Sequence, residues 1–124
     1  MDTEIYDALT HKIIGCCFEV HRELGLGFLE KIYSRALIEQ LTIENIKFEC
    51  EKEFNVFFKN KLIGKFRCDF YIEEKVILEI KSVTGIQPQL FQTQLISYLK
   101  ASKVKTGLLV NFGNGSCDVK RLSV

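Results

Sequence analysis

Asp69, Glu79 and Lys81 are the residues of this sequence whose types and spacing could do chemistry. Glu79 and Lys81 end an almost wholly apolar run, where removing a charge from water is costly unless something compensates it. Because they are two residues apart on an expected strand, their side chains point to the same face. If the preceding strand pairs antiparallel across the turn at Glu73-Glu74, Asp69 lies near the same edge of the sheet. The sequence therefore predicts that two carboxylates and one ammonium group converge.

Such a convergence is suited to the hydrolysis of a phosphodiester. Two carboxylates at close range repel each other, and a divalent cation with oxygen ligands relieves that repulsion. A lysine beside them can orient or deprotonate a water molecule and stabilise charge on a phosphate under attack. The same residues also allow a buried salt bridge between Glu79 and Lys81, with Asp69 in solvent. A second E-x-K triplet at residues 73–75 occupies a turn where it should do nothing, so the triplet alone is weak evidence.

Hydrophobic periodicity predicts the helices that must surround these residues. Apolar side chains recur at steps of three and four residues over 3–24 and again over 28–43, with Gly25-Leu26-Gly27 between the two stretches. The same period returns over 88–102, where Pro88 suits the first turn of a helix. We therefore expect two helices before the chemistry-bearing strands and one helix after them.

The strands follow from alternation and from apolar runs. A period of two predicts a hairpin with strands at 48–58 and 62–72, and it places Cys68 and Phe70 on one face and Asp69 on the other. The apolar, β-branched run that holds the E-x-K triplet suits a central strand covered on both faces. The remaining strands are expected at residues 76–81, 106–112 and 117–122. The order is α-α-β-β-β-α-β-β, which defines an α/β fold with a mixed central sheet flanked by helices.

Bulk composition narrows the class of protein. At 124 residues, 47% of them hydrophobic, the chain is expected to form a single domain over residues 1–124. Its net charge of +1 gives no overall signature of nucleic-acid binding, so any basic surface would have to be local. The five cysteines form no CxxC spacing, which argues against a disulfide framework and a thiolate metal site. No stretch approaches the roughly 20 apolar residues that span a bilayer, and we expect a cytoplasmic protein without membrane contact.

Four short motifs occur in an order that resembles a known family. Residues 27–33 read GFLEKIY, residues 64–69 read GKFRCD, the E-x-K triplet stands at 79–81, and residues 94–98 read QLISY. The first resembles a GxxExxY signature, the second a glycine-to-aspartate strand, and the last the QxxxY helix of RecB-like nucleases. Together they resemble the GxxExxY family of the PD-(D/E)XK nuclease superfamily over nearly the whole chain. The resemblance implies a restriction-endonuclease-like core.

The resemblance also implies roles for single residues at the acidic centre. Asp69 and Glu79 would bind Mg²⁺ or Mn²⁺, with the main-chain carbonyl of Ile80 as a further ligand. Lys81 would act on the attacking water. Glu30 would complete the metal shell directly or through water, although it could equally be a solvated charge near a helix N-terminus.

Other residues are implied as contacts with the substrate. Tyr33 lies one turn beyond Glu30, and Gln94 and Tyr98, also one turn apart, would face the site and contact substrate or fix the lysine. Core packing of Tyr98 and a surface position of Gln94 remain the alternatives. His21 could be a ligand or an acid near the site, or a structural or surface histidine of the first helix.

The expected function is that of an Mg²⁺-dependent phosphodiesterase of the deoxyribonuclease type, acting on nucleic acid, with DNA as the expected substrate. The alternative is a non-catalytic nucleic-acid-binding or protein-interaction module that keeps the nuclease fold. A ribonuclease using the same residues is a third reading. Because a small domain has little surface for reading sequence, a homodimer or a partner protein could supply selectivity.

Overall fold

A computed structural model describes residues 2–124 of the chain and the side chains from Ala8 onward. The three predicted helices are present as α1 (Asp2–Leu24), α2 (Glu30–Ile43) and α3 (Gln89–Ser102). The strands are β1 (Phe48–Cys50), β2 (Glu53–Phe58), β3 (Lys61–Arg67), β4 (Phe70–Ile72), β5 (Val76–Lys81), β6 (Thr106–Asn111) and β7 (Asp118–Ser123). No described helix is both long enough and apolar enough to cross a membrane.

Five of the strands form a mixed sheet in the order β1-β4-β5-β6-β7, while β2 and β3 form a separate two-stranded hairpin. The β5–β6 pair is parallel and is connected through α3, and the other pairs of the large sheet are antiparallel. A parallel pair needs such a crossover, whereas β4 and β5 are joined by a short turn. The predicted α/β class with a mixed sheet flanked by helices is confirmed.

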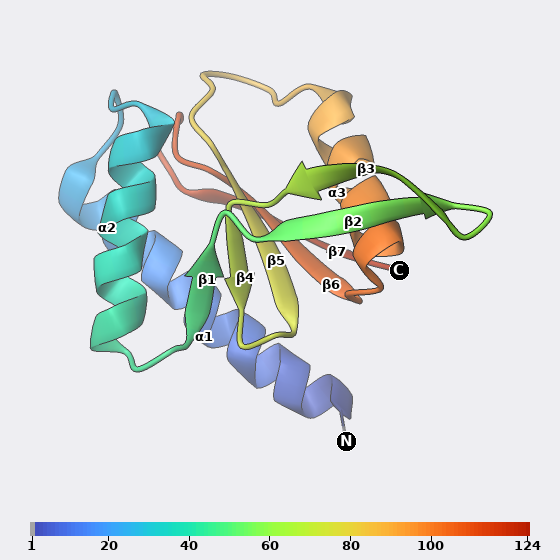
Figure 1. Cartoon of the computed structure of the whole chain (residues 1–124). Coiled ribbons are helices and arrows are strands. Elements are labelled where there is room, and N and C mark those ends of the chain that lie inside the picture. Colours follow the sequence, from blue (N-terminus) through green and yellow to red (C-terminus); the bar gives the residue numbers. More distant parts are fainter. Residues whose placement is uncertain (1) are drawn as a thin grey trace.

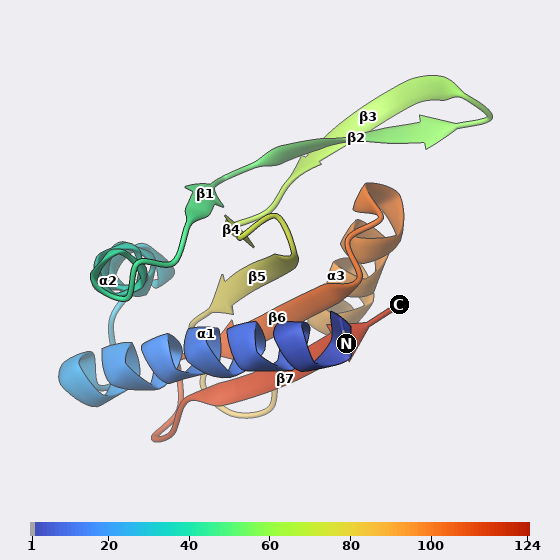
Figure 2. The same cartoon turned by 90° about the horizontal axis from the view of Figure 1, so that it is seen from below.

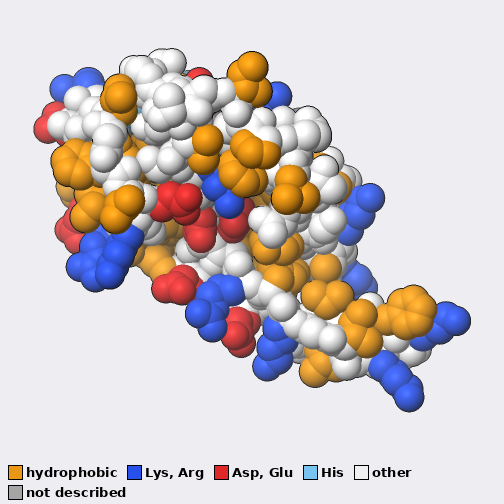
Figure 3. All heavy atoms as spheres, turned by 90° about the horizontal axis from the view of Figure 1, so that it is seen from above, with side chains coloured by type: hydrophobic (Ala, Val, Ile, Leu, Met, Phe, Trp, Pro, Cys, Tyr) orange, Lys and Arg blue, Asp and Glu red, His pale blue; other side chains and the backbone are white. Residues whose placement is uncertain are grey.

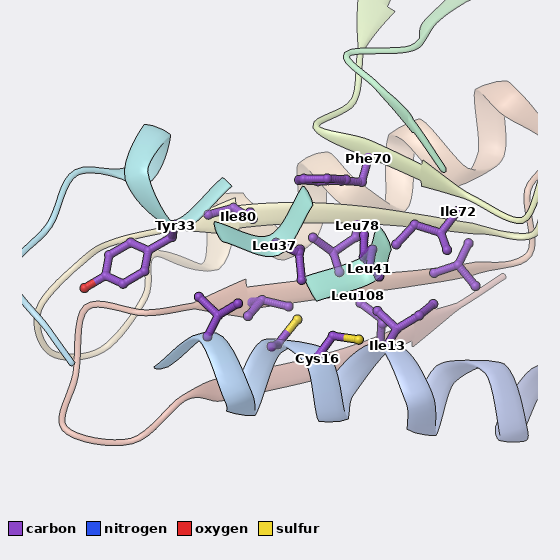
Figure 4. Close-up of a cluster of buried hydrophobic side chains, with 14 of the residues drawn as sticks. Ile13, Cys16, Tyr33, Leu37, Leu41, Phe70, Ile72, Leu78, Ile80 and Leu108 are labelled. Carbon is purple, nitrogen blue, oxygen red and sulfur yellow. The ribbon is translucent and has the colours of Figure 1, made fainter. Parts of the chain in front are cut away.

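The helices cover both faces of the large sheet (Figures 1 and 2). On one face, side chains of α1 and α2 pack against β4, β5 and β6, with Ile13, Leu37 and Leu78 among the buried members (Figure 4). On the other face, α3 packs Leu95 and Leu99 over the same strands. Coverage on both sides explains why β5 and β6 are apolar almost throughout, and it confirms the prediction of a central strand at 76–81.

Each of the two long strands expected in the hairpin is interrupted, so that part of it joins the large sheet and part forms the separate hairpin. The breaks lie side by side: Glu51 N–H donates to the Asp69 carbonyl at 2.9 Å, and Cys68 N–H donates to the Lys52 carbonyl at 3.0 Å. Glu51 has a φ of +54°, a conformation outside the strand region. The expectation of two continuous strands is therefore wrong.

The interruption also changes which way the side chains point. Phe70 packs on the α1 and α2 side of the sheet, whereas Cys68 packs on the α3 side. The expectation that Cys68 and Phe70 share a face is wrong because the pleat is broken between them. One consequence is functional: Asp69 lies at the point where β4 begins, beside the end of β5.

Candidate active site

Asp69 and Glu79 face each other across the ends of β4 and β5. The antiparallel register pairs Phe70 with Leu78, so the next pair outward is Asp69 with Glu79, as the sequence predicts. Asp69 N–H donates to Glu79 Oε2 at 2.7 Å, and Ile80 N–H donates to Asp69 Oδ2, also at 2.7 Å. Each carboxylate is thus fixed by the main chain of the opposite strand, which preorganises the pair.

Burial and mutual repulsion make negative charge on these two carboxyl groups unfavourable. Glu79 is only 7% exposed, and its pKa is raised to about 7 by burial first and by the charge of Asp69 second. Burial also raises the pKa of Asp69, against the opposing effects of the Ile80 N–H bond and the Lys81 charge. A divalent cation would offset this charge better than the single ammonium group nearby.

Lys81 lies on the same face of β5 as Glu79, yet the two are not locked together. Its Nζ lies 4.4 Å from the centroid of the Phe91 ring on α3, a cation–π contact. Within the part of the chain that the structure describes, Lys81 forms no ion pair with a carboxylate within 4.0 Å. Lys81 nevertheless lies near enough to lower the pKa of both carboxyl groups. The arrangement leaves the ammonium group available instead of consuming it in a buried salt bridge.

A hollow of about 650 Å³ opens beside Asp69, between α2 and the strand ends. Acidic side chains gather around a hollow in the space-filling view (Figure 3). Glu30, Asp69 and Ile80, three of the four residues predicted to bind metal, line it together with Glu51 and Arg35. The charge of Glu30 also contributes to the raised pKa of Glu79. The structure therefore places Glu30, which comes from a separate helix, on the hollow that Asp69 also lines.

The oxygen donors present fit a cation that keeps part of its water shell. Among the described residues, no three carboxylate, histidine or cysteine side chains lie close enough to form a full ligand set. In a strand the N–H and C=O of one residue point to the same side, so the Ile80 carbonyl lies on the side of Asp69. Mg²⁺ typically uses one or two carboxylates and retains several waters. Asp69, Glu79 and the Ile80 carbonyl match that pattern, with Glu30 placed to act through water.

Tyr33 lies inside the protein and does not face the hollow. Its side chain is fully buried, stacks on Phe112 with centroids 4.6 Å apart, and donates its hydroxyl to the Gly25 carbonyl at 2.6 Å. The expected contact with substrate is therefore replaced by a structural role in holding the loop before α2. Residues three apart on a helix differ in direction by roughly 60°, enough for Glu30 to face solvent while Tyr33 faces the core.

His21 is also placed structurally. It is 8% exposed, and its Nε2 lies 2.8 Å from the Asn114 carbonyl, with the ring stacked over Phe112. These contacts tie α1 to the loop after β6. The described contacts of His21 are thus with that loop and the core, in line with the structural alternative.

The two α3 residues are placed differently from each other. Tyr98 is half-buried, stacks on Phe66 with centroids 4.1 Å apart, and lies near the acidic pair. Burial raises the pKa of Tyr98, and the charges of Glu79 and Asp69 add to the effect. Gln94 is exposed one turn earlier on α3. Tyr98 therefore borders the site, and Gln94 lies on the surface that leads to it.

Asn111 has a role that the motifs and periodicity of the sequence do not indicate. It is fully buried at the end of β6, opposite Lys81, and its side chain bonds both the N–H and the C=O of Val83 at 2.8 Å. It also accepts from Gly113 N–H at 3.1 Å. Gly113 has no room for a side chain, because a Cβ there would lie 2.4 Å from the Val83 main chain. The sequence signal for this role is a polar asparagine at the end of an otherwise apolar strand, where a buried amide needs hydrogen-bond partners.

We expect Asn111→Ala to lower the free energy of unfolding by about 2–4 kcal/mol, because the half-buried main-chain groups of Val83 and the buried N–H of Gly113 lose their partner. Asn114→Ala is the matched control, since Asn114 makes two analogous bonds to Gly85 but is only half-buried. Urea denaturation of both variants measures the difference. A loss in Asn111→Ala no larger than that in Asn114→Ala would contradict the assigned role.

The fold and the site together define the class of protein. A mixed sheet carrying an acidic pair and a lysine at the ends of two neighbouring strands is consistent with a restriction-endonuclease-like fold. The family model described as the PD-(D/E)XK nuclease superfamily matches residues 7–122, and the chain belongs to that superfamily.

A solved structure is similar to the chain in its fold. The crystal structure of SSO0001 is similar to the chain with a TM-score of 0.61 and 22% sequence identity, over 75% of this chain and 48% of that one. The chain thus spans about half the length of SSO0001, and at this identity the likeness concerns the fold alone. A search of curated proteins found no match.

Proposed function

We propose that the chain is a metal-dependent nuclease of the GxxExxY, RecB-like kind, which hydrolyses phosphodiester bonds in DNA with Mg²⁺ or Mn²⁺. The observation that carries the proposal is the preorganised Asp69–Glu79 pair, in which Glu79 is buried and Asp69 half-buried. Lys81 lies beside it and forms no ion pair with either of these two carboxylates. When a cation is bound, such a pair can support catalysis. Without a cation, the repulsion between the two carboxylates lowers the stability of the folded protein. Membership of a nuclease superfamily supports the same reading.

In the proposed reaction, different residues of the chain bind the cation, act on the phosphate and contact the nucleic acid. Asp69, Glu79 and the Ile80 carbonyl would hold the cation, which when bound supplies charge stabilisation at a phosphate and a more acidic water. Lys81, held over Phe91, can take or give a proton at Nζ and can stabilise negative charge on the phosphate oxygens. Glu30 would orient solvent from the opposite side of the hollow. Tyr98 and Gln94 would contact the nucleic acid along α3.

One observation favours a second candidate, a non-catalytic module that keeps the fold. The described residues provide no complete set of three ligand side chains, so a cation could bind too weakly to support turnover. This candidate predicts nucleic-acid binding without cleavage and no heat of binding with millimolar Mg²⁺ or Mn²⁺. The two functions are therefore separable by a single assay.

Cleavage of end-labelled DNA, and of matched RNA, should require Mg²⁺ or Mn²⁺ and stop in EDTA. Asp69→Asn should reduce the rate by about 10³-fold, since a lost ligand removes several kcal/mol of stabilisation. Glu74→Gln, a change of an exposed acid in the turn before β5, is the matched control and should leave the rate unchanged. Cleavage that persists equally in Asp69→Asn would come from a contaminant and reject the proposal.

A further inference from the structure

The hairpin formed by β2 and β3 projects from the body of the protein as an arm, defined as residues 53–67 (Figure 2). Its outer half exposes large hydrophobic side chains on a protein of modest size. These are Phe57 at 60%, Phe58 at 60%, Leu62 at 53% and Ile63 at 63% exposure. Because side chains alternate along a strand, Phe57 and Leu62 lie on one face of the arm and Phe58 lies on the other. Both faces therefore expose large hydrophobic side chains, which is typical of a binding surface.

The arm is built to hold its shape. Lys59 and Asn60 both have positive φ, +48° and +67°, as in the tight two-residue turns that match the twist of a hairpin. At its base, Phe54 and Phe66 stack with centroids 5.3 Å apart, and Phe66 stacks in turn on Tyr98 of α3. The exposed side chains therefore project from a paired hairpin whose base packs against α3.

The charge of the arm indicates an anionic occupant. Residues 54–66 contain three lysines, Lys59, Lys61 and Lys65, and no acidic residue. Lysine and hydrophobic side chains mark this end of the molecule in Figure 3, in contrast to the acidic hollow. A second copy of the chain docked symmetrically on this surface would oppose lysines with lysines, which is unfavourable. A nucleic acid, with one negative charge on each nucleotide, offers the complementary charge.

The aromatic side chains indicate which form of nucleic acid fits. Exposed phenylalanines interleaved with lysines are the combination that binds single strands, because unpaired bases can stack on the rings while phosphates meet the cations. Paired bases inside a duplex present no free face for such stacking. The path to the site is continuous, since Phe66 at the base of the arm stacks on Tyr98, which borders the acidic pair.

We propose that the arm binds unpaired nucleotides next to the phosphodiester that is cleaved, with Phe57 and Phe58 stacking on bases at opposite faces of the arm and Lys59 and Lys61 contacting phosphates. The substrate class is then single-stranded or locally unpaired nucleic acid. The assignment of cleavage rests on the proposed function, whereas binding by the arm does not.

The test is fluorescence anisotropy of the full chain in EDTA, with a labelled oligothymidine and a duplex of equal length. Phe57→Ala and Phe58→Ala should each weaken single-strand binding by about 10-fold or more, with little effect on the duplex. Phe18→Ala is the matched control, because Phe18 is 51% exposed on α1. Lys59→Ala combined with Lys61→Ala should reduce the salt slope of single-strand binding by about 1.4.

Three results would overturn the inference. Equal losses on duplex and single strand would reject unpaired nucleotides as the ligand, and unchanged affinity in all arm variants would reject the arm as the binding element. A shift from dimer to monomer in sedimentation of Phe57→Ala would assign the surface to self-association instead. Because binding is measured without metal, each result is independent of whether the wild-type chain cleaves.

Discussion

Lys81→Ala should lower the rate of metal-dependent cleavage by about 10²–10⁴-fold, the range typical of a lost proton-transfer group. The reason is the position of the Lys81 Nζ, which lies over the Phe91 ring and close enough to lower the pKa of the Asp69 and Glu79 carboxyl groups. It forms no ion pair with either of them. Because no ion pair is lost, the variant should fold and still bind nucleic acid. Single-turnover cleavage with saturating enzyme measures the effect on the chemical step.

The chain carries its own control for this prediction. Lys75 belongs to the second E-x-K triplet, at residues 73–75, and is exposed in the turn before β5. Lys75→Ala removes the same charge from the same type of motif without touching the acidic pair. Similar rates for Lys75→Ala and Lys81→Ala would show that the position of the lysine does not matter, contrary to the proposed role.

Glu79→Gln should make the metal-free protein more stable at pH 8 while abolishing cleavage. The pKa of Glu79 is about 7 in the folded protein against an ordinary value of 4.5, so the folded state binds the proton more tightly. The resulting stability is fully present below pH 4.5 and is lost as the pH rises through 7, by up to about 3 kcal/mol. Glutamine removes this loss and keeps an oxygen to accept from Asp69 N–H.

Urea denaturation in EDTA at pH 5 and pH 8 measures the effect. The wild type should be less stable at pH 8, and Glu79→Gln should show a smaller decline, with the remainder due partly to Asp69, whose pKa is also raised. Mg²⁺ should restore stability to the wild type at pH 8 and not to the variant. If the stability of the two proteins declines equally between pH 5 and pH 8, the charge of Glu79 does not destabilise the folded protein.

The sequence predicted those features that depend on local patterns. Helical periodicity located all three helices, and the apolar run ending in Glu79 identified a central strand because both of its faces are covered. The turn at Glu73-Glu74 was sufficient to bring Asp69 opposite Glu79, since a short connection enforces antiparallel pairing. The centre of the site therefore follows from neighbouring segments.

The features that were missed depend on contacts between distant segments. Alternation runs unbroken through Phe66, Cys68 and Phe70, and nothing local reveals that the chain changes sheets there. The positive φ of Glu51 has no sequence signal, because the residue is not a glycine. The contact of Lys81 with Phe91 depends on how α3 packs. Such arrangements are set by tertiary packing and are invisible to periodicity.

The most direct test of the central claim is a crystal soaked in MnCl₂, with the cation located by its anomalous signal. We expect one Mn²⁺ bound by an oxygen of Asp69, an oxygen of Glu79 and the main-chain carbonyl of Ile80, with Lys81 free of both carboxylates. The same soak of Asp69→Asn should give no signal at this position. A wild-type site without Mn²⁺, in which Glu79 is bonded to Lys81, would show that the acidic pair does not hold a metal ion.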